Sequence, residues 1–154
     1  MTEFTSNAKT NGQLDDYLNP ALGMMSQWFD QRHSADEPML FVVEGKSGSG
    51  KSMLAKKLSA EGHAVSYVDL RPSRPFQFES PQTPDPRKYC DAHTVIFDDP
   101  DPMYADALKE AVEFLLGRGK SIVIMAQLKT DVGPELLGQA GVAVLDKSGL
   151  NVTK

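Results

Sequence analysis

The stretch EGKSGSGKS, residues 44–52, combines glycines, lysines and serines between the apolar run MLFVV and a stretch with helical patterning. Glycine-type backbone angles allow such a loop to wrap around an anion with its N–H groups pointing inward and no side chain in the way. A helix that starts at the end of the loop adds unpaired N–H groups and the positive end of its dipole. These residues are therefore suited to binding a chain of phosphates.

The spacing of this stretch matches the pattern G-x-x-x-x-G-K-[ST] at Gly45, Gly50, Lys51 and Ser52. In that pattern Lys51 reaches the β- and γ-phosphates, and the Ser52 hydroxyl is a ligand of Mg²⁺. An ordinary glycine-rich turn is the alternative, but the preceding strand pattern and the following helix pattern favour the phosphate loop. The predicted nucleotide-binding residues are Gly45, Lys46, Ser47, Gly48, Ser49, Gly50, Lys51, Ser52 and Met53.

Two further segments place polar side chains after apolar runs. In HTVIFDDPD, Asp98 is predicted to hold the metal through water, and Asp99 to orient or deprotonate an attacking water. Asp99 has the alternative of a plain turn residue before Pro100. Gln127 ends SIVIMAQ and is expected to contact the γ-phosphate or the water, or else to bond only to its own loop. We predict that Lys51, Asp99 and Gln127 are catalytic and that Ser52 and Asp98 hold the metal.

Apolar strands alternate with amphipathic helices through most of the chain. Strands are expected at 39–44, 64–70, 94–99, 121–127 and 142–146, and helices at 51–62, 103–119 and 133–140. Strands that are apolar on both faces and alternate with helices indicate a parallel sheet covered on both sides. The expected fold is therefore α/β, with three layers and a parallel five-stranded sheet.

Around this core, from 39 to 146, we expect a tail with an amphipathic helix over 1–38 and a C-terminal tail over 147–154. The N-terminal helix carries apolar residues at helical spacing, and it either packs on the flank of the domain or binds a partner: Leu22, Met25, Trp28 and Phe29. The Pro-rich segment 71–93 has no usable period. We interpret it as a mobile loop for substrate or partner rather than a disordered insertion.

The totals narrow the class of protein. The chain has 154 residues and a formal net charge of −5, which argues against a generally basic nucleic-acid-binding surface. Cys90 is the only cysteine, so an intrachain disulfide is impossible and a reducing compartment is expected. The polar N-terminal stretch and the lack of a long apolar run lead us to expect a cytoplasmic protein that does not enter a membrane.

Together these residues resemble the P-loop NTPase superfamily over 39–146, with GKSGSGKS as the phosphate loop and TVIFDD as the second acidic motif. The resemblance implies a doubly wound sheet, Mg²⁺-dependent nucleotide binding and usually hydrolysis. The GTP-type base-reading pattern NKxD is not present in the sequence. This favours ATP as the nucleotide.

Within the superfamily, the additional-strand ATPases (AAA+, RecA-like and DNA-translocating types) are the first interpretation. Asp99 and Gln127 resemble their second acid and their strand-ending polar residue. VSYVDL and IMAQ are similar to segments of the DNA-translocating and packaging members. The chain departs from the pattern because Asp99 stands where Glu is commoner and because no arginine finger is identifiable. The candidate arginines are Arg71, Arg74, Arg87 and Arg118.

Three alternatives stay open. Lys46, five residues before Lys51, resembles the extra lysine of partition-type ATPases, although that family's catalytic Asp is replaced here by Arg71, two residues after Asp69. Small-molecule kinases share SGSGKS but need an arginine-rich lid that is not recognisable here. The fold could also bind ATP as a switch without significant turnover.

The chain holds little beyond a minimal nucleotide-binding core. ATPases of this kind usually borrow an arginine from a neighbouring subunit to stabilise charge in the transition state. We therefore expect a homo-oligomer or a larger complex. With a net charge of −5, any contact with DNA is expected to be local or made through a partner.

Overall fold

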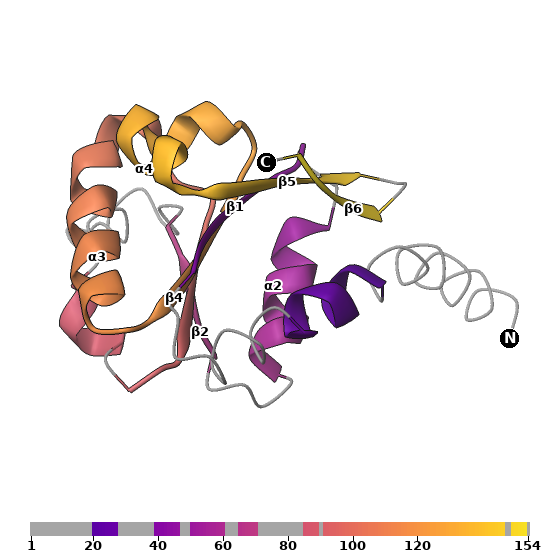
Figure 1. The fold of residues 1–154 in the computed structure, drawn as a ribbon, viewed down its shortest axis with the longest axis horizontal. Coiled ribbons are helices and arrows are strands. Elements are labelled where there is room, and N and C mark those ends of the chain that lie inside the picture. Colours follow the sequence, from indigo (N-terminus) through magenta and orange to yellow (C-terminus); the bar gives the residue numbers. More distant parts are fainter. Residues whose placement is uncertain are drawn as a thin grey trace, which may run out of the picture.

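The computed structural model describes residues 20–27, 39–46, 50–60, 65–70, 85–89, 91–146 and 149–153. They form a mixed α/β domain with a central sheet and helices on both faces (Figure 1). The strands are β1 (Leu40–Glu44), β2 (Val65–Asp69), β3 (Thr94–Asp98), β4 (Ser121–Ala126), β5 (Gly141–Asp146) and β6 (Gly149–Val152). The α-helices include α2 (Lys51–Ala60), α3 (Ala105–Gly117) and α4 (Pro134–Gln139), and the short 3₁₀ turns are η1 (Pro86–Tyr89), η2 (Pro102–Tyr104) and η3 (Lys129–Val132).

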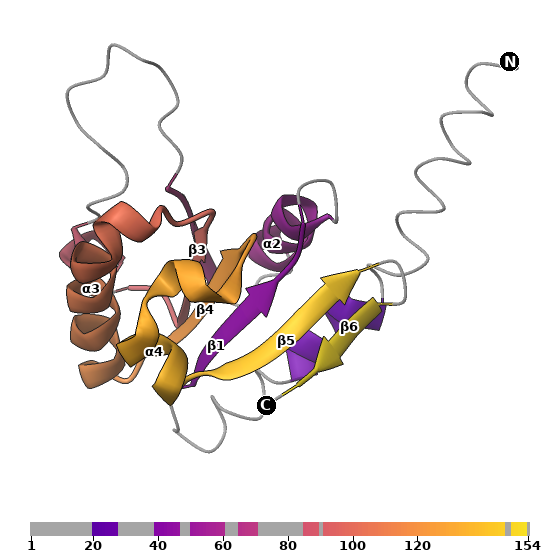
Figure 2. The same cartoon turned by 90° about the horizontal axis from the view of Figure 1, so that it is seen from above.

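The strands lie in the order β2-β3-β4-β1-β5-β6. Figure 2 shows the order from β3 to β6. The first five strands of this order are paired in parallel, and β6 is antiparallel to β5. The parallel sheet with helices on both faces is therefore confirmed, with a strand at each of the five expected places. No helix among the described residues is both long enough and apolar enough to cross a membrane.

The number of strands is corrected from five to six, because β6 forms within the segment 147–154 that was expected to be a tail. Gly149 has φ 111°, a left-handed backbone that favours glycine, and it pairs with Asp146. Leu150 is buried opposite Leu145. The strand was missed because one buried leucine and one exposed valine are too few to give a recognisable alternation.

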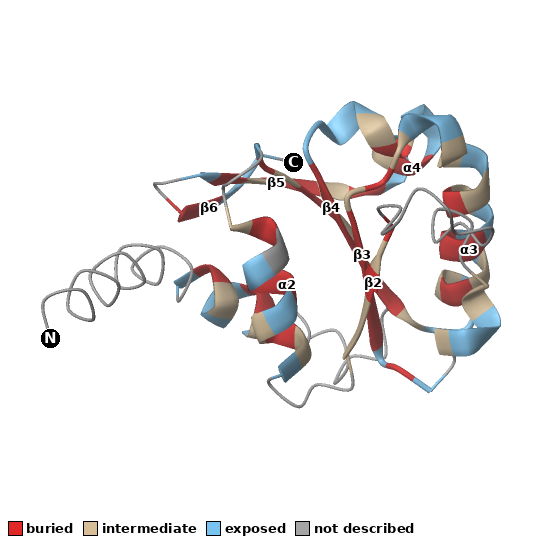
Figure 3. Cartoon of the chain, turned by 180° about the vertical axis from the view of Figure 1, so that it is seen from behind, coloured by how far each residue is buried: buried red, intermediate tan, exposed pale blue. Residues whose placement is uncertain are grey.

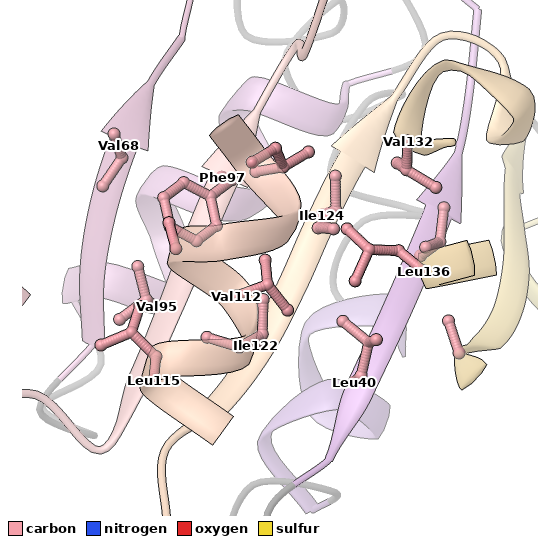
Figure 4. Close-up of a cluster of buried hydrophobic side chains, with 14 of the residues drawn as sticks. Leu40, Val68, Val95, Phe97, Val112, Leu115, Ile122, Ile124, Val132 and Leu136 are labelled. Carbon is pink, nitrogen blue, oxygen red and sulfur yellow. The ribbon is translucent and has the colours of Figure 1, made fainter. Parts of the chain in front are cut away.

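The sheet buries side chains on both faces, which explains the continuous apolar runs of its strands (Figure 3). On β3, Val95 and Phe97 point to the face covered by α3 and α4, whereas Ile96 points to the face covered by α2. Figure 4 shows the first of these clusters, where α3 contributes Val112 and Leu115. Because successive residues of a strand face opposite sides, each motif at a strand end has a defined face.

Residues 20–27 form a helix on the α2 side of the sheet. Ala21 and Met25, four residues apart, are fully buried in the same cluster as Leu54 and Leu58 of α2. This part of the N-terminal helix packs on the flank of the domain, as the first interpretation expected. Trp28 and Phe29 lie outside the described residues.

Part of the Pro-rich segment is packed on the domain. The Asp85 carboxylate accepts a hydrogen bond from the backbone N–H of Arg87 at 3.1 Å, which starts the turn η1. The Tyr89 ring then meets the Phe97 ring edge to face, with centroids 6.3 Å apart. This end of the segment is therefore anchored to the core, while 71–84 and Cys90 lie outside the described residues.

Candidate functional site

Backbone hydrogen bonds join the carboxyl ends of the neighbouring strands β1, β4, β3 and β2. The Gly45 N–H donates to the Ala126 carbonyl at 2.9 Å, and the Asp99 N–H donates to the Met125 carbonyl at 2.8 Å. The Leu70 N–H donates to the carbonyl of Asp98 at 2.9 Å. The first residue of the phosphate-loop pattern, Gly45, therefore lies with the acidic pair and Gln127 along one edge of the sheet, the edge at which ligands bind in open α/β folds.

The described part of the predicted phosphate loop has the backbone that the sequence pattern requires. Gly50 has φ 95°, which is accessible to glycine and strained for other residues. The Leu54 N–H donates to the Gly50 carbonyl at 2.8 Å, so α2 begins directly at the end of the loop. Gly45 is buried, Lys46 is exposed, and Met53 is 39% exposed in the first turn of α2. Ser47, Gly48, Ser49 and the side chain of Ser52 lie outside the described residues.

Lys51 is buried at the first position of α2, with 7% of its surface exposed. Its ammonium group donates to the Gly45 carbonyl at 2.5 Å and to the Lys46 carbonyl at 3.3 Å. The side chain thus turns back across the loop toward its first residues. Burial of a charged ammonium group is costly unless polar partners compensate for the lost water, and here two backbone carbonyls do so. A lysine kept buried and charged beside a glycine-rich loop is better suited to binding an anion than to being a solvated surface residue.

Asp98 is buried at the end of β3, with 1% of its surface exposed. Side chains two residues apart on a strand share a face, so Asp98 lies on the same face as Ile96, the face covered by α2. Tyr67 of β2 donates its hydroxyl hydrogen to Asp98 Oδ2 at 2.5 Å. Among the described residues no group of three or more His, Cys, Asp and Glu side chains could hold a metal ion. A single carboxylate nevertheless fits Mg²⁺ bound together with a nucleotide, because Mg²⁺ typically keeps waters and takes only one or two carboxylates besides substrate phosphates.

Asp99 has φ 62° and is the only non-glycine residue with a positive φ among those described. The left-handed backbone costs an L-residue about 1–2 kcal/mol, although Asp and Asn tolerate it better than most. Asp99 is half-buried, and its left-handed backbone ends the regular up-and-down alternation of the β3 side chains. Such strain is concentrated at functional positions, which supports a role beyond that of a turn residue.

Gln127 directly follows β4 and is exposed. Two residues later, the backbone N–H of Lys129 donates a hydrogen bond to Glu44 Oε2 at 2.7 Å, which fixes the chain after Gln127. Sequence reasoning missed both Glu44 and Tyr67. Their signals were weak, because Glu44 is a polar residue at the end of an apolar strand and Tyr67 is one of several partly buried residues of β2.

Two of the four candidate arginines, Arg87 and Arg118, are among the described residues. Arg118 follows α3 and precedes β4, so it lies at the amino edge of the sheet, where its guanidinium carbon is 4.8 Å from the centroid of the Phe114 ring. Arg87 is exposed and paired with Asp85 at 3.1 Å, and its hydrogen bond lowers the pKa of the Asp85 carboxyl. Arg71 and Arg74 lie outside the described residues. Arg118 is therefore not placed to complete the site of its own chain, and Arg87 is already paired with Asp85.

Comparison with known proteins supports the fold. The structure of AMPPCP-bound DnaA from Aquifex aeolicus matches with a TM-score of 0.54 and 12% identity, covering 80% of this chain and 45% of that chain. Bacteroides sp Pif1 in complex with ADP-AlF4 matches with a TM-score of 0.45 and 16% identity, covering 80% of this chain and 41% of that one. No protein-family model matches the sequence. A search of curated proteins also finds no match.

The chain therefore shares its fold with part of DnaA, and it spans less than half the length of each of the two matched chains. At 12% identity the likeness to DnaA concerns the fold alone. What the chain does must be argued from its own site.

Proposed function

We propose that this protein binds ATP together with Mg²⁺ and hydrolyses it. The observation that carries the proposal is the gathering of buried Lys51, buried Asp98 and strained Asp99 at one edge of the sheet, beside the start of α2. In this proposal Lys51 neutralises charge on the β- and γ-phosphates, and Ser52 and Asp98 hold the metal. Bound Mg²⁺ would supply further charge neutralisation at the phosphates.

The water that attacks the γ-phosphate would be oriented or deprotonated by Asp99. Its carboxylate stands one residue beyond the metal-holding Asp98, on a backbone turned out of the strand. Gln127 would donate its amide hydrogens to the γ-phosphate or bind the water. The exposure of Gln127 fits a side chain that meets a ligand rather than the core.

The strand order supports the additional-strand branch of the superfamily. β4, which leads into Gln127, lies between β1 with its phosphate loop and β3 with Asp98. This inserted strand is the feature from which the branch takes its name, and it argues against the partition-type and small-molecule-kinase alternatives. We therefore propose an ATPase of that branch.

The partners belong to the same proposal. No arginine among the described residues is seen to reach the site. In this proposal a neighbouring subunit or partner supplies one, so the ATPase is completed in a homo-oligomer or a larger complex. The complex would act on DNA or on a protein assembly. The similarity of VSYVDL and IMAQ to DNA-translocating members is the support for DNA. We propose a cytoplasmic location for this assembly.

The proposal is tested by calorimetry with Mg·ATP and by phosphate release from the purified protein, with and without DNA, alongside mass from light scattering. Lys51→Ala should weaken binding by about 10–100-fold, since charge-assisted hydrogen bonds contribute about 1.5–3 kcal/mol each. Lys56→Ala is the matched control, because Lys56 is an exposed lysine on the same helix. Equal affinity of wild type and Lys51→Ala would refute the phosphate site. Tight binding with no turnover under any condition would leave the ATP-binding switch as the function.

A further inference from the structure

Tyr67 of β2 connects a strand that carries none of the predicted site residues to the predicted metal ligand. Its hydroxyl donates to Asp98 Oδ2 at 2.5 Å, and Asp98 is almost completely buried. Hydrogen bonds from a hydroxyl to a carboxylate are about 2.5–2.7 Å long and roughly twice as strong as neutral ones. The Tyr67 hydroxyl is therefore within hydrogen-bond distance of the buried carboxylate.

The main chain of β2 contacts the same residue. Leu70, directly after β2, donates its N–H to the carbonyl oxygen of Asp98 at 2.9 Å, so β2 and the residue that follows it contact both the backbone and the side chain of Asp98. The strand pairing explains how the tyrosine reaches it. Tyr67 pairs with Ile96, two residues before Asp98, and side chains two residues apart share a face of the sheet. The ring therefore lies diagonally across from the carboxylate, within the reach of a long aromatic side chain.

We propose that Tyr67 is a positioning residue that fixes the Asp98 carboxylate in the orientation required to hold Mg²⁺ beside a bound nucleotide. The proposal rests on the proposed function. Carboxylates that hold metals are themselves hydrogen-bonded, and removal of such outer partners typically lowers metal affinity or activity by about 10–100-fold. A hydroxyl bound to one carboxylate oxygen also restricts rotation of the group, so the other oxygen has a defined direction.

The first experiment measures the Mg²⁺ concentration that half-saturates Mg²⁺-dependent binding of the analogue AMPPCP, by calorimetry, for the full chain. Tyr67→Phe should raise this concentration by about 10–100-fold, while binding of AMPPCP in EDTA stays within about twofold of wild type. Tyr89→Phe is the control, because Tyr89 is also a partly buried tyrosine against β3 but packs on the opposite face. Its Mg²⁺ dependence should be that of wild type.

The outcomes separate the two proposals. If wild type binds no nucleotide, the proposed function and the role of Tyr67 both fail. If wild type shows Mg²⁺-dependent binding and Tyr67→Phe shows the same dependence, only the role of Tyr67 is overturned. If Tyr67→Phe weakens binding equally with and without Mg²⁺, its role is structural and the proposal also fails.

A second measurement does not depend on the stability of Tyr67→Phe. The chain has four tyrosines, so wild-type protein labelled with ¹³C at the tyrosine Cζ gives few NMR signals. Substitution of each of the other three tyrosines by Phe, one at a time, identifies the signal of Tyr67. Addition of Mg²⁺ to the AMPPCP complex should shift the Tyr67 signal and leave that of Tyr89 in place, because Tyr67 bonds to the Asp98 carboxylate whereas Tyr89 packs on the opposite face of the sheet. An unchanged Tyr67 signal at saturating Mg²⁺ would overturn the proposal.

Discussion

The carboxylate of Glu44 accepts a hydrogen bond from the backbone N–H of Lys129, with 2.7 Å between Oε2 and N. Directly beside it, the Gly45 N–H donates to the Ala126 carbonyl at 2.9 Å. The two bonds attach the chain on both sides of Gln127 to the start of the phosphate loop. The position of Gln127 is therefore tied to the residues that would hold the phosphates.

Loss of the Glu44 bond should affect catalysis more than binding. Glu44→Ala is expected to lower kcat by about 2–10-fold, because one hydrogen bond of this kind contributes about 0.5–1.5 kcal/mol, while the affinity for Mg·ATP stays near wild type. Glu44→Gln keeps an oxygen that can accept the bond and should retain most of the turnover. Steady-state phosphate release and calorimetry give the two quantities. Equal losses in both variants would instead attribute the effect to the charge of Glu44.

The adjacent acids should have separable roles. Asp98→Asn is expected to weaken Mg²⁺-dependent nucleotide binding, because the buried carboxylate is the proposed metal ligand. Asp99→Asn should leave binding intact and slow turnover by about 10²-fold or more, the scale of a lost general base. Asn tolerates the left-handed backbone of Asp99, so this substitution changes the chemistry with little change of conformation. Wild-type hydrolysis by Asp99→Asn would remove the main support for its catalytic role.

The backbone of Asp99 predicts an unusual order of stabilities. At φ 62°, Asp99→Gly should be more stable than Asp99→Ala by about 1 kcal/mol, since alanine is strained in this region and glycine is not. At Glu110, an exposed position within α3, the order should reverse by a similar amount. Chemical denaturation of the four variants measures both differences. Alanine more stable than glycine at both positions would show that Asp99 does not have this conformation in solution.

An arginine supplied by a second subunit should make turnover depend on assembly. The specific activity is expected to rise with protein concentration, and substitution of one arginine by alanine should flatten the rise without lowering ATP affinity. Arg87 and Arg118 are the described candidates, and Arg71 and Arg74 complete the set. Phosphate release over a concentration series, with mass from light scattering, makes the comparison. High and constant activity from dilute monomer upward would show that one chain holds a complete site.

Much of the fold could be read from the sequence because its signals are local. The run MLFVV followed by three glycines and Lys51 predicts a strand, a loop and a helix without reference to the rest of the chain, and β1, Gly50 with its positive φ and α2 agree. Alternation of apolar strands and helices was likewise sufficient for a parallel sheet with two covered faces. The short strand β6 was not predicted, because its stability depends on pairing with β5 rather than on a pattern in its own sequence.

The residue types of the candidate site were also set by the sequence, since Lys51, Asp98, Asp99 and Gln127 each stand at a recognisable point of a strand or loop. Their spatial order was decided by the tertiary structure. No local pattern states that β4 lies between β1 and β3, or that Tyr67 of β2 reaches Asp98. Such relationships arise from the packing of strands that are distant in the chain, and their energies depend on pairs of residues rather than on either residue alone.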